Sequence, residues 1–325
     1  MNPLLEREKG LLELERRIED LRSASEGKRI DMSAEIASLE SKYRQVLAEL
    51  FGSLTPWEKV HMARHPRRPT ALYYIAGFDA FDELHGDRMS RDDSAIVGGF
   101  ARLGGHSIVA IGQQRGRDMK ENLARNFGMS TPEGYRKGER LALLAERFNL
   151  PLVTFVDTKG ADPGILSEEH AQSEAIASSL EVFAGLKVPT LCVVIGEGGS
   201  GGALALAIAD RVLMLEHSVY SVASPEGCAA ILWGDASKAE EAAAHLKLTA
   251  ADLRGFGIID EVIPEPLGGA HRDPEGTVTR VLDRVGALLD VLETYSLREL
   301  LDARYEKYRH LGSWRDAVAG SDGAT

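Results

Sequence analysis

Two amphipathic helices are predicted at the start of the chain by the spacing of its apolar residues. Leu11, Leu14, Ile18 and Leu21 lie three or four positions apart, and the same spacing recurs in residues 36–50. Apolar residues at this spacing share one helix face. The polar residues 23–33 between the two segments predict that they form a helical hairpin. Its apolar stripe could pack within the chain or against a partner, and the sequence favours neither.

Farther along, apolar runs alternate with helical patterns. Two strand-like runs flank Gly104-Gly105 and predict a β-hairpin. Further strands are predicted at 152–157, 190–195, 211–216, 219–224 and 258–266, and helices from Thr131-Pro132, near Ser167, from Ser224-Pro225 and from about Pro274. Strands that alternate with helices indicate parallel β-α units and therefore the α/β class.

Composition narrows the function. The 325 residues are 44% hydrophobic and 27% charged, which is ordinary for a globular protein, and they are long enough for a sizeable core. The net charge of −12 gives no general attraction for nucleic acid or anionic membranes. Two distant cysteines, Cys192 and Cys228, predict neither a zinc ribbon nor a disulfide framework. No signal core or membrane-length apolar run is present, so we expect a cytoplasmic protein without a membrane span.

Two glycine-rich segments follow neighbouring predicted strands. They read TKGADPG (158–164) and GEGGSGG (196–202), and Gly196, Gly198 and Gly201 match the dinucleotide pattern G-x-G-x-x-G. A glycine turn before a helix exposes N–H groups that accept a pyrophosphate or the oxyanion of a transition state. Against a nicotinamide dinucleotide, the segment lies deep within the β-α series and its helix is short. The residues alone leave both alternatives open.

Several longer motifs carry a resemblance to a known family. They are ARHPRRP, FDELHGDR, NFGMSTPEGYRK, VIGEGGSGGALA, YSVASPEGCAAILW and IIDEVIPEPLGGAHR, and they run from about residue 55 to 275. In these stretches the chain resembles the alpha-subunit family of bacterial acetyl-CoA carboxylase carboxyltransferases. The resemblance implies a crotonase-like (ClpP/crotonase) ββα superhelix with an N-terminal helical hairpin and a C-terminal helix. It divides the chain into a hairpin at 1–54, a carboxyltransferase domain at 55–297, and a C-terminal helix with a flexible tail at 298–325.

The activity implied by the resemblance is a carboxyl transfer that serves fatty acid synthesis. Carboxybiotin on a biotin carboxyl carrier protein gives its carboxyl group to acetyl-CoA, and malonyl-CoA is formed. The implied partners are a zinc-containing beta subunit in an α2β2 assembly, the carrier protein and biotin carboxylase, with no metal in this chain. Alternatives are a subunit of another crotonase-type acyl-CoA carboxyltransferase or decarboxylase, a nicotinamide-dependent dehydrogenase, and a non-catalytic assembly partner.

The site residues also follow from the resemblance. The backbone N–H groups of Gly201 and Gly202 are expected to form an oxyanion hole for the ureido oxygen of biotin. Gly198 and Gly199 are expected to shape the approach, and the Gly160-Ala161 pair lines the same cleft.

The TKGADPG segment departs from the family, in which it reads D-T-P-G-A-Y-P-G, because Lys159 replaces Pro and Asp162 replaces Tyr. We interpret Lys159 and Asp162 as a local ion pair; attraction of the carboxylate of carboxybiotin by Lys159 is the alternative.

Other polar residues are expected to have structural or solvating roles rather than catalytic ones. We expect Glu197 to solvate its turn. Ser200 is not expected to be a hydrolase nucleophile, since the glycines around it are interpreted as falling outside a G-x-S-x-G frame and no Asp–His pair can be assigned to it. His61 and His65 are spaced as in a zinc helix, but Met62 stands where that motif needs Glu, so helix-end histidines are expected. The basic stretch that starts at Arg115 and Arg117 is interpreted as a solvated face rather than a site for CoA phosphates or an acidic carrier.

Overall fold

A single sheet forms the centre of the molecule, and the computed structural model describes it within residues 3–28 and 31–312. Its strands are β1 (Ala80–Glu83), β2 (Ile96–Leu103), β3 (His106–Gln113), β4 (Leu152–Thr158), β5 (Thr190–Gly199), β6 (Arg211–Leu215), β7 (Val219–Ser221) and β8 (Glu261–Ile263). The order is β1-β2-β3-β4-β5-β6-β8, with β7 paired to β5. β1, β2 and β3 are antiparallel and the rest of the sheet is parallel, which confirms the predicted hairpin and β-α units.

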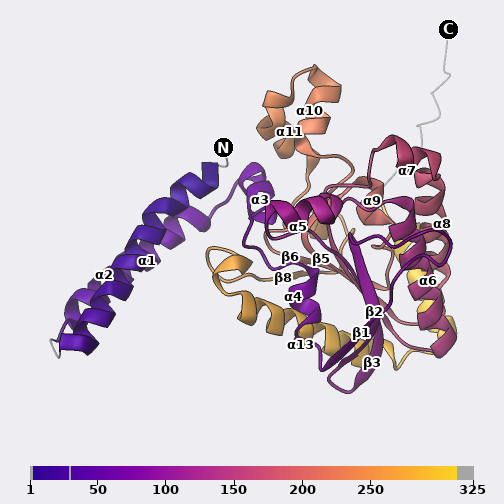
Figure 1. Cartoon of the computed structure of the whole chain (residues 1–325), viewed down its shortest axis with the longest axis horizontal. Helices are drawn as coiled ribbons and strands as arrows, with labels where there is room; N and C mark the ends of the chain where they lie inside the picture. The colour runs from indigo at the N-terminus through magenta and orange to yellow at the C-terminus, as the bar shows by residue number, and fades with distance from the viewer. Residues whose placement is uncertain (1–2, 29–30, 313–325) are drawn as a thin grey trace, which may run out of the picture.

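Helices cover both faces of this sheet (Figure 1). The described helices are α3 (Pro56–Ala63), α4 (Ala71–Ile75), α5 (Met119–Ala124), α6 (Pro132–Phe148), α7 (Ile165–Glu169), α8 (Gln172–Gly185), α9 (Ser200–Leu204), α10 (Pro225–Trp233), α11 (Ala239–Leu246), α12 (Ala250–Gly255), α13 (Pro274–Leu292) and α14 (Leu297–Arg309), with short 3-10 turns at Asn126–Gly128, Ala236–Lys238 and Ala270–Arg272. Caps account for several starts. Ser224 accepts from the Gly227 N–H with Pro225 first in α10, as predicted.

The central strands are buried on both faces, and their residues alternate between two cores. Val153 and Phe155 of β4 pack toward α4 and α13, whereas Leu152 and Val156 pack toward α6 and α8. Successive side chains of a strand point to opposite faces, so a continuous apolar run supplies both cores. The unbroken runs PLVTFVD and LCVVI therefore reflect their central position in the sheet.

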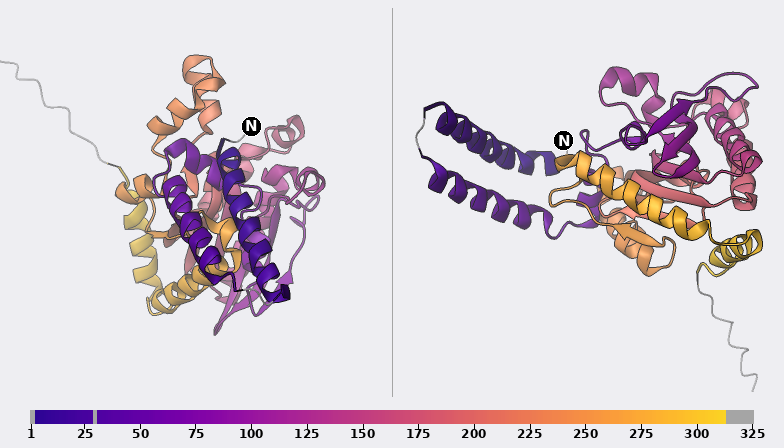
Figure 2. Two further views of the ribbon diagram at one scale, coloured as in Figure 1. Left: turned by 90° about the vertical axis from the view of Figure 1, so that its left-hand side faces the viewer. Right: turned by 90° about the horizontal axis from the view of Figure 1, so that it is seen from below.

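The two N-terminal helices, α1 (Pro3–Lys28) and α2 (Ser33–Phe51), form the predicted hairpin and project from the body (Figures 1 and 2). Buried Leu11, Leu47 and Phe51 meet Met62 of α3 at the base of the hairpin. The stripe thus packs within the chain at its base. Residues 313–325, part of the predicted tail, lie outside the described residues. No helix within the described ranges combines the length and apolarity that crossing a membrane requires.

Candidate functional site

The site is built where β4 and β5 end side by side. The two strands run parallel, with Thr158 opposite Gly198 after an irregularity in the register. Contrary to the expectation of a glycine turn, residues 196–199 continue strand β5, because β7 pairs with Glu197, Gly198 and Gly199. The helix α9 then starts directly at Ser200. The carboxyl ends of β4 and β5 lie at the same edge of the sheet, and this is the edge where parallel sheets usually bind ligands.

The two glycine segments touch each other, and only glycine permits the contact. A Cβ at Gly199 would lie 2.0 Å from the carbonyl oxygen of Lys159, and a Cβ at Gly202 would lie 2.4 Å from the nitrogen of Ala161. Gly160 has a φ of +152°, which side chains other than glycine rarely adopt. The structure therefore brings Gly199, Gly202, Gly160 and Ala161 together.

Gly198 and Gly201 hold different positions. A Cβ at Gly198 would meet the ring of Tyr220 at 2.9 Å, so this glycine serves the packing of β5 under that ring. A Cβ at Gly201 would meet only Ile176, at an ordinary 3.6 Å. Gly201 also lines an apolar cavity of about 330 Å³ together with Ser200 and Leu204.

Backbone donors gather at this contact. The N–H groups of Gly201 and Gly202 lie in the first turn of α9, where a helix offers them no acceptor, and no side chain caps it. In the other segment, Gly160 N–H donates to Thr158 Oγ1 at 3.2 Å, and Asp162 N–H donates to Ser130 O at 2.9 Å. Ala161 N–H finds no acceptor within the described part of the chain. Three donors are thus available, and Ala161 rather than Gly160 contributes from the first segment.

Side chains fix both segments from behind. Gln113 Nε2 donates to the carbonyl of Gly202 at 2.7 Å, and Gln113 Oε1 accepts from the N–H of Asp157 at 3.2 Å. Thr158 Oγ1 lies 2.7 Å from the carbonyl oxygen of Gly128. Because these partners are buried, the donors keep their geometry without a ligand, as preorganised oxyanion stabilisation requires.

Asp162 does not pair with Lys159, so the predicted ion pair is wrong. Its carboxylate accepts from Ser167 Oγ at 2.5 Å and from Asn126 Nδ2 at 3.0 Å. Lys159 Nζ instead lies over the ring of Phe127, 5.9 Å from its centroid. Short side-chain hydrogen bonds satisfy a carboxylate without a counter-ion. The sequence did not indicate that Asn126 and Ser167 would supply these bonds.

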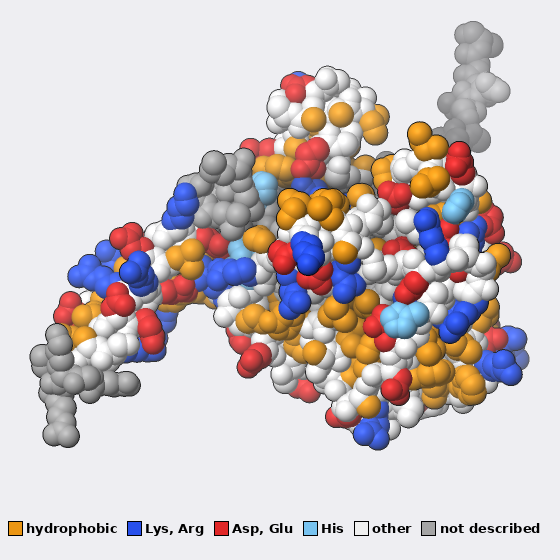
Figure 3. All heavy atoms as spheres, viewed as in Figure 1, with side chains coloured by type: hydrophobic (Ala, Val, Ile, Leu, Met, Phe, Trp, Pro, Cys, Tyr) orange, Lys and Arg blue, Asp and Glu red, His pale blue; other side chains and the backbone are white. Residues whose placement is uncertain are grey.

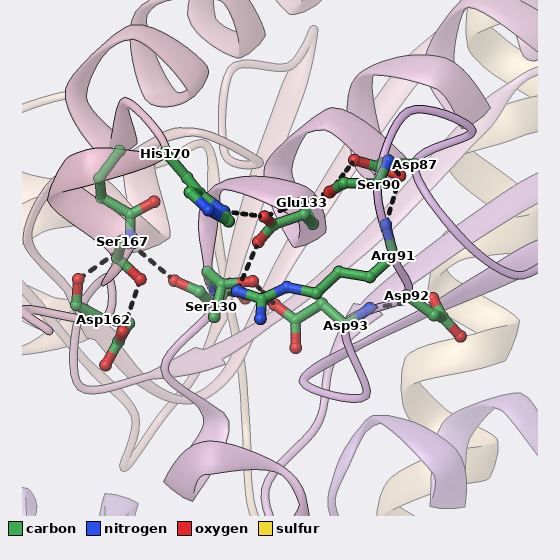
Figure 4. Close-up of polar contacts among 12 residues, drawn as sticks. Asp87, Ser90, Arg91, Asp92, Asp93, Ser130, Glu133, Asp162, Ser167 and His170 are labelled. Atoms are coloured by element: carbon green, nitrogen blue, oxygen red, sulfur yellow. Dashed lines mark hydrogen bonds and ion pairs between the residues drawn. The ribbon is translucent and has the colours of Figure 1, made fainter. Parts of the chain in front are cut away.

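A second carboxylate orders the region around this segment. Figure 4 shows Glu133, in the first turn of α6, between His170 and Arg91. His170 Nδ1 lies 2.6 Å from Glu133 Oε1, and Arg91 Nη2 lies 3.2 Å from Oε2. Burial opposes ionisation of Glu133, yet the hydrogen bonds from His170 and its neighbours lower its pKa to about 2. The carboxylate therefore stays charged and holds α6 against the loop before α8.

Glu197 is buried and does not solvate a turn, which corrects its prediction. Arg64 holds it with two hydrogen bonds, Nε to Oε2 at 3.0 Å and Nη2 to Oε1 at 2.6 Å. Arg64 Nη1 also donates to Glu226 Oε1 of α10 at 2.6 Å. Burial would raise the pKa of Glu226, but the hydrogen bond and charge of Arg64 lower it. Arg64 thus connects the glycine strand with α10.

Ser200 occupies a strained strand-to-helix junction with a φ of +56°. Contrary to the expectation that Ser200 lies outside such a frame, Gly198, Ser200 and Gly202 have the G-x-S-x-G spacing of a nucleophile elbow. No histidine hydrogen bonds to the Ser200 hydroxyl among the described residues. The structure therefore agrees that Ser200 belongs to no hydrolase triad.

One buried cluster has side chains of the kind that bind metals. Glu8, His65 and His271 offer ligand atoms within 4.8 Å of one another, whereas His61 makes an edge-to-face contact with Trp57. The His65 and His271 rings are stacked at 3.7 Å, so their Nε2 atoms face the two oxygens of Glu8 in parallel, at 3.3 and 3.1 Å. His65 Nδ1 accepts from the N–H of Arg67, which leaves its Nε2 to donate. The arrangement joins α1 to the body by hydrogen bonds to a carboxylate.

Comparison with known proteins gives the family. Residues 4–312 match the family described as acetyl co-enzyme A carboxylase carboxyltransferase-like. Over 318 residues the chain is 52% identical to the acetyl-coenzyme A carboxylase carboxyl transferase subunit alpha of Burkholderia multivorans, covering 98% of both chains. It is 53% identical to the protein of that name from Xylella fastidiosa over 318 residues, covering 97% of this chain and 100% of the other.

Solved structures support the same fold. The malonate decarboxylase hetero-dimer of Pseudomonas matches with a TM-score of 0.56 and 18% identity over 77% of this chain and 96% of that one. The beta subunit of Pseudomonas aeruginosa geranyl-CoA carboxylase matches with a TM-score of 0.54 and 19% identity over 76% of this chain and 45% of that one. The predicted crotonase-like fold is confirmed, and the dinucleotide alternative is not supported. The chain belongs to the acetyl co-enzyme A carboxylase carboxyltransferase-like family.

Proposed function

We propose that this chain is the alpha subunit of an acetyl-CoA carboxylase carboxyltransferase. It transfers the carboxyl group of carboxybiotin, presented by a carrier protein, to acetyl-CoA and so forms malonyl-CoA. The names of relatives that are 52–53% identical over nearly the whole chain support the reaction. The geometry of the glycine contact supports the part that this chain plays in it.

The observation that carries the proposal is the close contact between the two segments that contain the three backbone donors. We place the N–H groups of Ala161, Gly201 and Gly202 around one acceptor, because a Cβ at Gly202 would lie only 2.4 Å from the Ala161 nitrogen. A ureido carbonyl is an uncharged acceptor that gains negative charge when the carboxyl group leaves. Donors already in place stabilise that charge, and each typically contributes about 10²–10³ in rate.

The role of each residue follows from its contacts. Biotin, carboxylated on its carrier, supplies the activated carboxyl group. Gly201 and Gly202 donate to the ureido oxygen, and Ala161 donates from the other segment. We assign the shaping of the approach to Gly198 and Gly199, which leave room for the Tyr220 ring and the Lys159 carbonyl, and Gly160, with a φ of +152°, directly precedes Ala161. The buried side chains behind both segments hold these donors still, so no acid–base side chain of this chain needs to act.

The assembly is part of the proposal. The chain works with a beta subunit in an α2β2 complex, and it receives carboxybiotin from the carrier protein that biotin carboxylase loads. We propose that residues 1–54 form a separate hairpin unit, that 55–297 form the transferase domain, and that 298–325 form the terminal helix and tail. Relatives named as an alpha subunit and structural neighbours solved as hetero-oligomers support a multi-subunit enzyme.

The test is a mixing experiment. Biotin-dependent decarboxylation of malonyl-CoA is measured with this chain, with a beta subunit, and with both together. Activity only in the mixture supports the proposal. Turnover by this chain alone, or an inactive mixture whose complex is intact by size-exclusion chromatography, contradicts it. Replacement of acetyl-CoA by propionyl-CoA in the forward direction tests the acyl preference.

A further inference from the structure

Lys159, at the rim of the glycine contact, is a cation that pairs with no carboxylate in the described part of the chain. It follows β4 directly and precedes Gly160, and its carbonyl oxygen touches Gly199. Asp162 is satisfied by Asn126 and Ser167, as described above. The ammonium group lies over the face of Phe127, which attracts a cation but leaves its charge uncompensated.

Lys159 faces a cavity of about 220 Å³ that is lined by basic side chains. The cations on its wall are Arg64, Arg68, Arg115, Arg117 and Lys159, and no lining residue among the described ones is acidic. This volume is below the range of about 300–1,000 Å³ that is usual for pockets of drug-sized ligands. The cavity is therefore suited to one small charged group of a ligand. Figure 3 shows Lys and Arg side chains gathered beside α5, whose start flanks the cavity.

Each arginine of the cavity already has a carboxylate behind it. Arg68 binds Glu265 at 2.6 Å, Arg115 lies 2.7 Å from Asp157, and Arg117 lies 3.2 Å from Glu121. Arg64 is held by Glu197 and Glu226, as shown above. The partners neutralise the arginines and fix their positions, and the interpretation of Arg115 as part of a solvated face is wrong. Lys159 is the one cation of the lining that contacts no carboxylate among the described residues, so its ammonium is left for a ligand with a single negative charge rather than a phosphate dianion.

The backbone around Phe127 is held in an unusual conformation. Asn126, Phe127 and Gly128 have φ values of 45°, 55° and 79° in succession. A non-glycine residue in this region is strained and persists only where its surroundings impose the conformation. Here Asn126 Nδ2 donates to Met129 O at 2.9 Å as well as to Asp162, which fixes the segment. The strained turn places the aromatic ring under Lys159.

We propose that Lys159 and its basic cavity bind the carboxylate of the carboxylated biotin substrate, and so discriminate it from uncarboxylated biotin. The inference rests on the proposed function, because it places the ureido oxygen on the adjacent glycine donors. In an N-carboxylated ureido group the carboxylate is bonded to the nitrogen next to that carbonyl. Lys159 belongs to the same segment as Ala161, and its carbonyl oxygen touches Gly199. We therefore assign the carboxylate to the Lys159 ammonium when the carbonyl meets Ala161 and Gly202.

The effect of this contact falls on binding. The carboxylate carries its charge in the bound reactant and loses it as the carboxyl group is transferred, so the cation stabilises the reactant at least as much as the transition state. Lys159→Met is expected to raise KM for the carboxylated carrier about three- to tenfold, without a fall in kcat. KM for neutral biocytin in the reverse reaction stays unchanged. Structural damage would instead lower kcat in both directions.

Direct binding gives a readout that does not need turnover. The assembled complex is titrated by calorimetry with biotin amide and with a stable biotin amide that carries a carboxymethyl group on the ureido nitrogen. The wild type binds the carboxymethyl probe more tightly at low salt, and the preference shrinks as ionic strength rises. Lys159→Met abolishes the preference and Lys159→Arg keeps it. Lys238→Met is the matched control, because Lys238 also lies over an aromatic ring, Trp233, at 5.8 Å but outside the cavity.

Two results would overturn the inference. One is an equal preference for the carboxymethyl probe in Lys159→Met and wild type. The other is tighter binding of inorganic phosphate than of the carboxymethyl probe, which would assign the cavity to a phosphate. If neither biotin compound binds to wild type and the mixture does not decarboxylate malonyl-CoA, the proposed function itself fails. If the wild type transfers the carboxyl group normally and Lys159→Met keeps the wild-type KM and probe preference, only this inference fails and the proposed function stands.

Discussion

Alanine substitution at two adjacent glycines separates packing from chemistry at the candidate oxyanion hole. At Gly202, the added Cβ would lie 2.4 Å from the Ala161 nitrogen, far inside the 3.4 Å at which ordinary contact begins. Backbone atoms cannot swing away as a side chain can, so the two segments must separate. At Gly201, the added Cβ meets only Ile176 Cγ2, at 3.6 Å. That methyl group fits without movement.

These distances set the expected magnitudes. Overpacking in a well-packed site costs about 1–3 kcal/mol, so Gly202→Ala should lower the free energy of unfolding by that amount. If it also displaces the Ala161 or Gly202 N–H, transfer falls by about 10²–10³. Gly201→Ala keeps its N–H and removes a flexible residue from a helix, so its stability should change by less than about 1 kcal/mol. Its activity should stay within about threefold of wild type.

The assay compares both variants in the complex with the beta subunit. Thermal unfolding gives the stability, and biotin-dependent decarboxylation of malonyl-CoA gives the activity. An inactive Gly201→Ala beside an active Gly202→Ala would refute the reasoning, because the ligand would then lie on the Ile176 side of α9. Full activity in both variants would remove the glycine contact from the mechanism.

Three further predictions concern the groups that hold the site and the hairpin. Burial lowers the pKa of His271, and, despite the burial of Glu8, hydrogen bonds from the two histidines lower the pKa of Glu8. Both groups therefore resist protonation in the folded state, so the stability of α1 should fall as the pH drops below about 6.5 and further below about 4.5. The loss should appear as faster hydrogen exchange in α1, and the step near pH 6.5 should be absent in His271→Gln. Arg64→Met leaves the Glu197 carboxylate buried without its cation and should cost about 3–5 kcal/mol in urea unfolding, whereas Arg64→Met combined with Glu197→Gln should recover much of that loss. Arg304 is buried and donates to one carboxylate and several carbonyls, so Arg304→Ala should destabilise the protein by a similar amount and release α14 to proteolysis, while an unchanged melting temperature would contradict that role.

The elements were predictable where local physics decides them. Continuous apolar runs such as LCVVI predict central strands, and a Ser or Thr before Pro predicts the starts of α6 and α10, since caps depend on neighbours within four residues. The end of β5 was not predictable in this way. The strand continues through residues 197–199 because β7, about twenty residues later, pairs with them, and Thr158 of β4 also pairs with Gly198. Glycine-rich sequence favours a turn until a distant segment provides hydrogen-bond partners.

The polar contacts of the site were predicted less well, because they join residues far apart in the chain. Glu197 pairs with Arg64, 133 positions away, and sequence gives no distance between them. Asp162 looked available to Lys159 because both stand in one short turn. Its actual partners, Asn126 and Ser167, come from segments on either side. Proximity in sequence brings charges together only when no closer hydrogen-bond donor competes.

The glycines themselves show why a pattern of residue types is weak evidence for a ligand. Of the three that match the dinucleotide pattern, Gly196 leaves room for the Asp157 carboxylate, 2.3 Å from where its Cβ would be, and Gly198 leaves room for a tyrosine ring at 2.9 Å. The third, Gly201, has no such constraint. Gly199 and Gly202, which the pattern ignores, are the positions where the second segment rests on the backbone. Two of the three glycines in the G-x-G-x-x-G pattern thus serve the packing of a strand against its neighbours, and the donors for a ligand depend on a contact that no single motif contains.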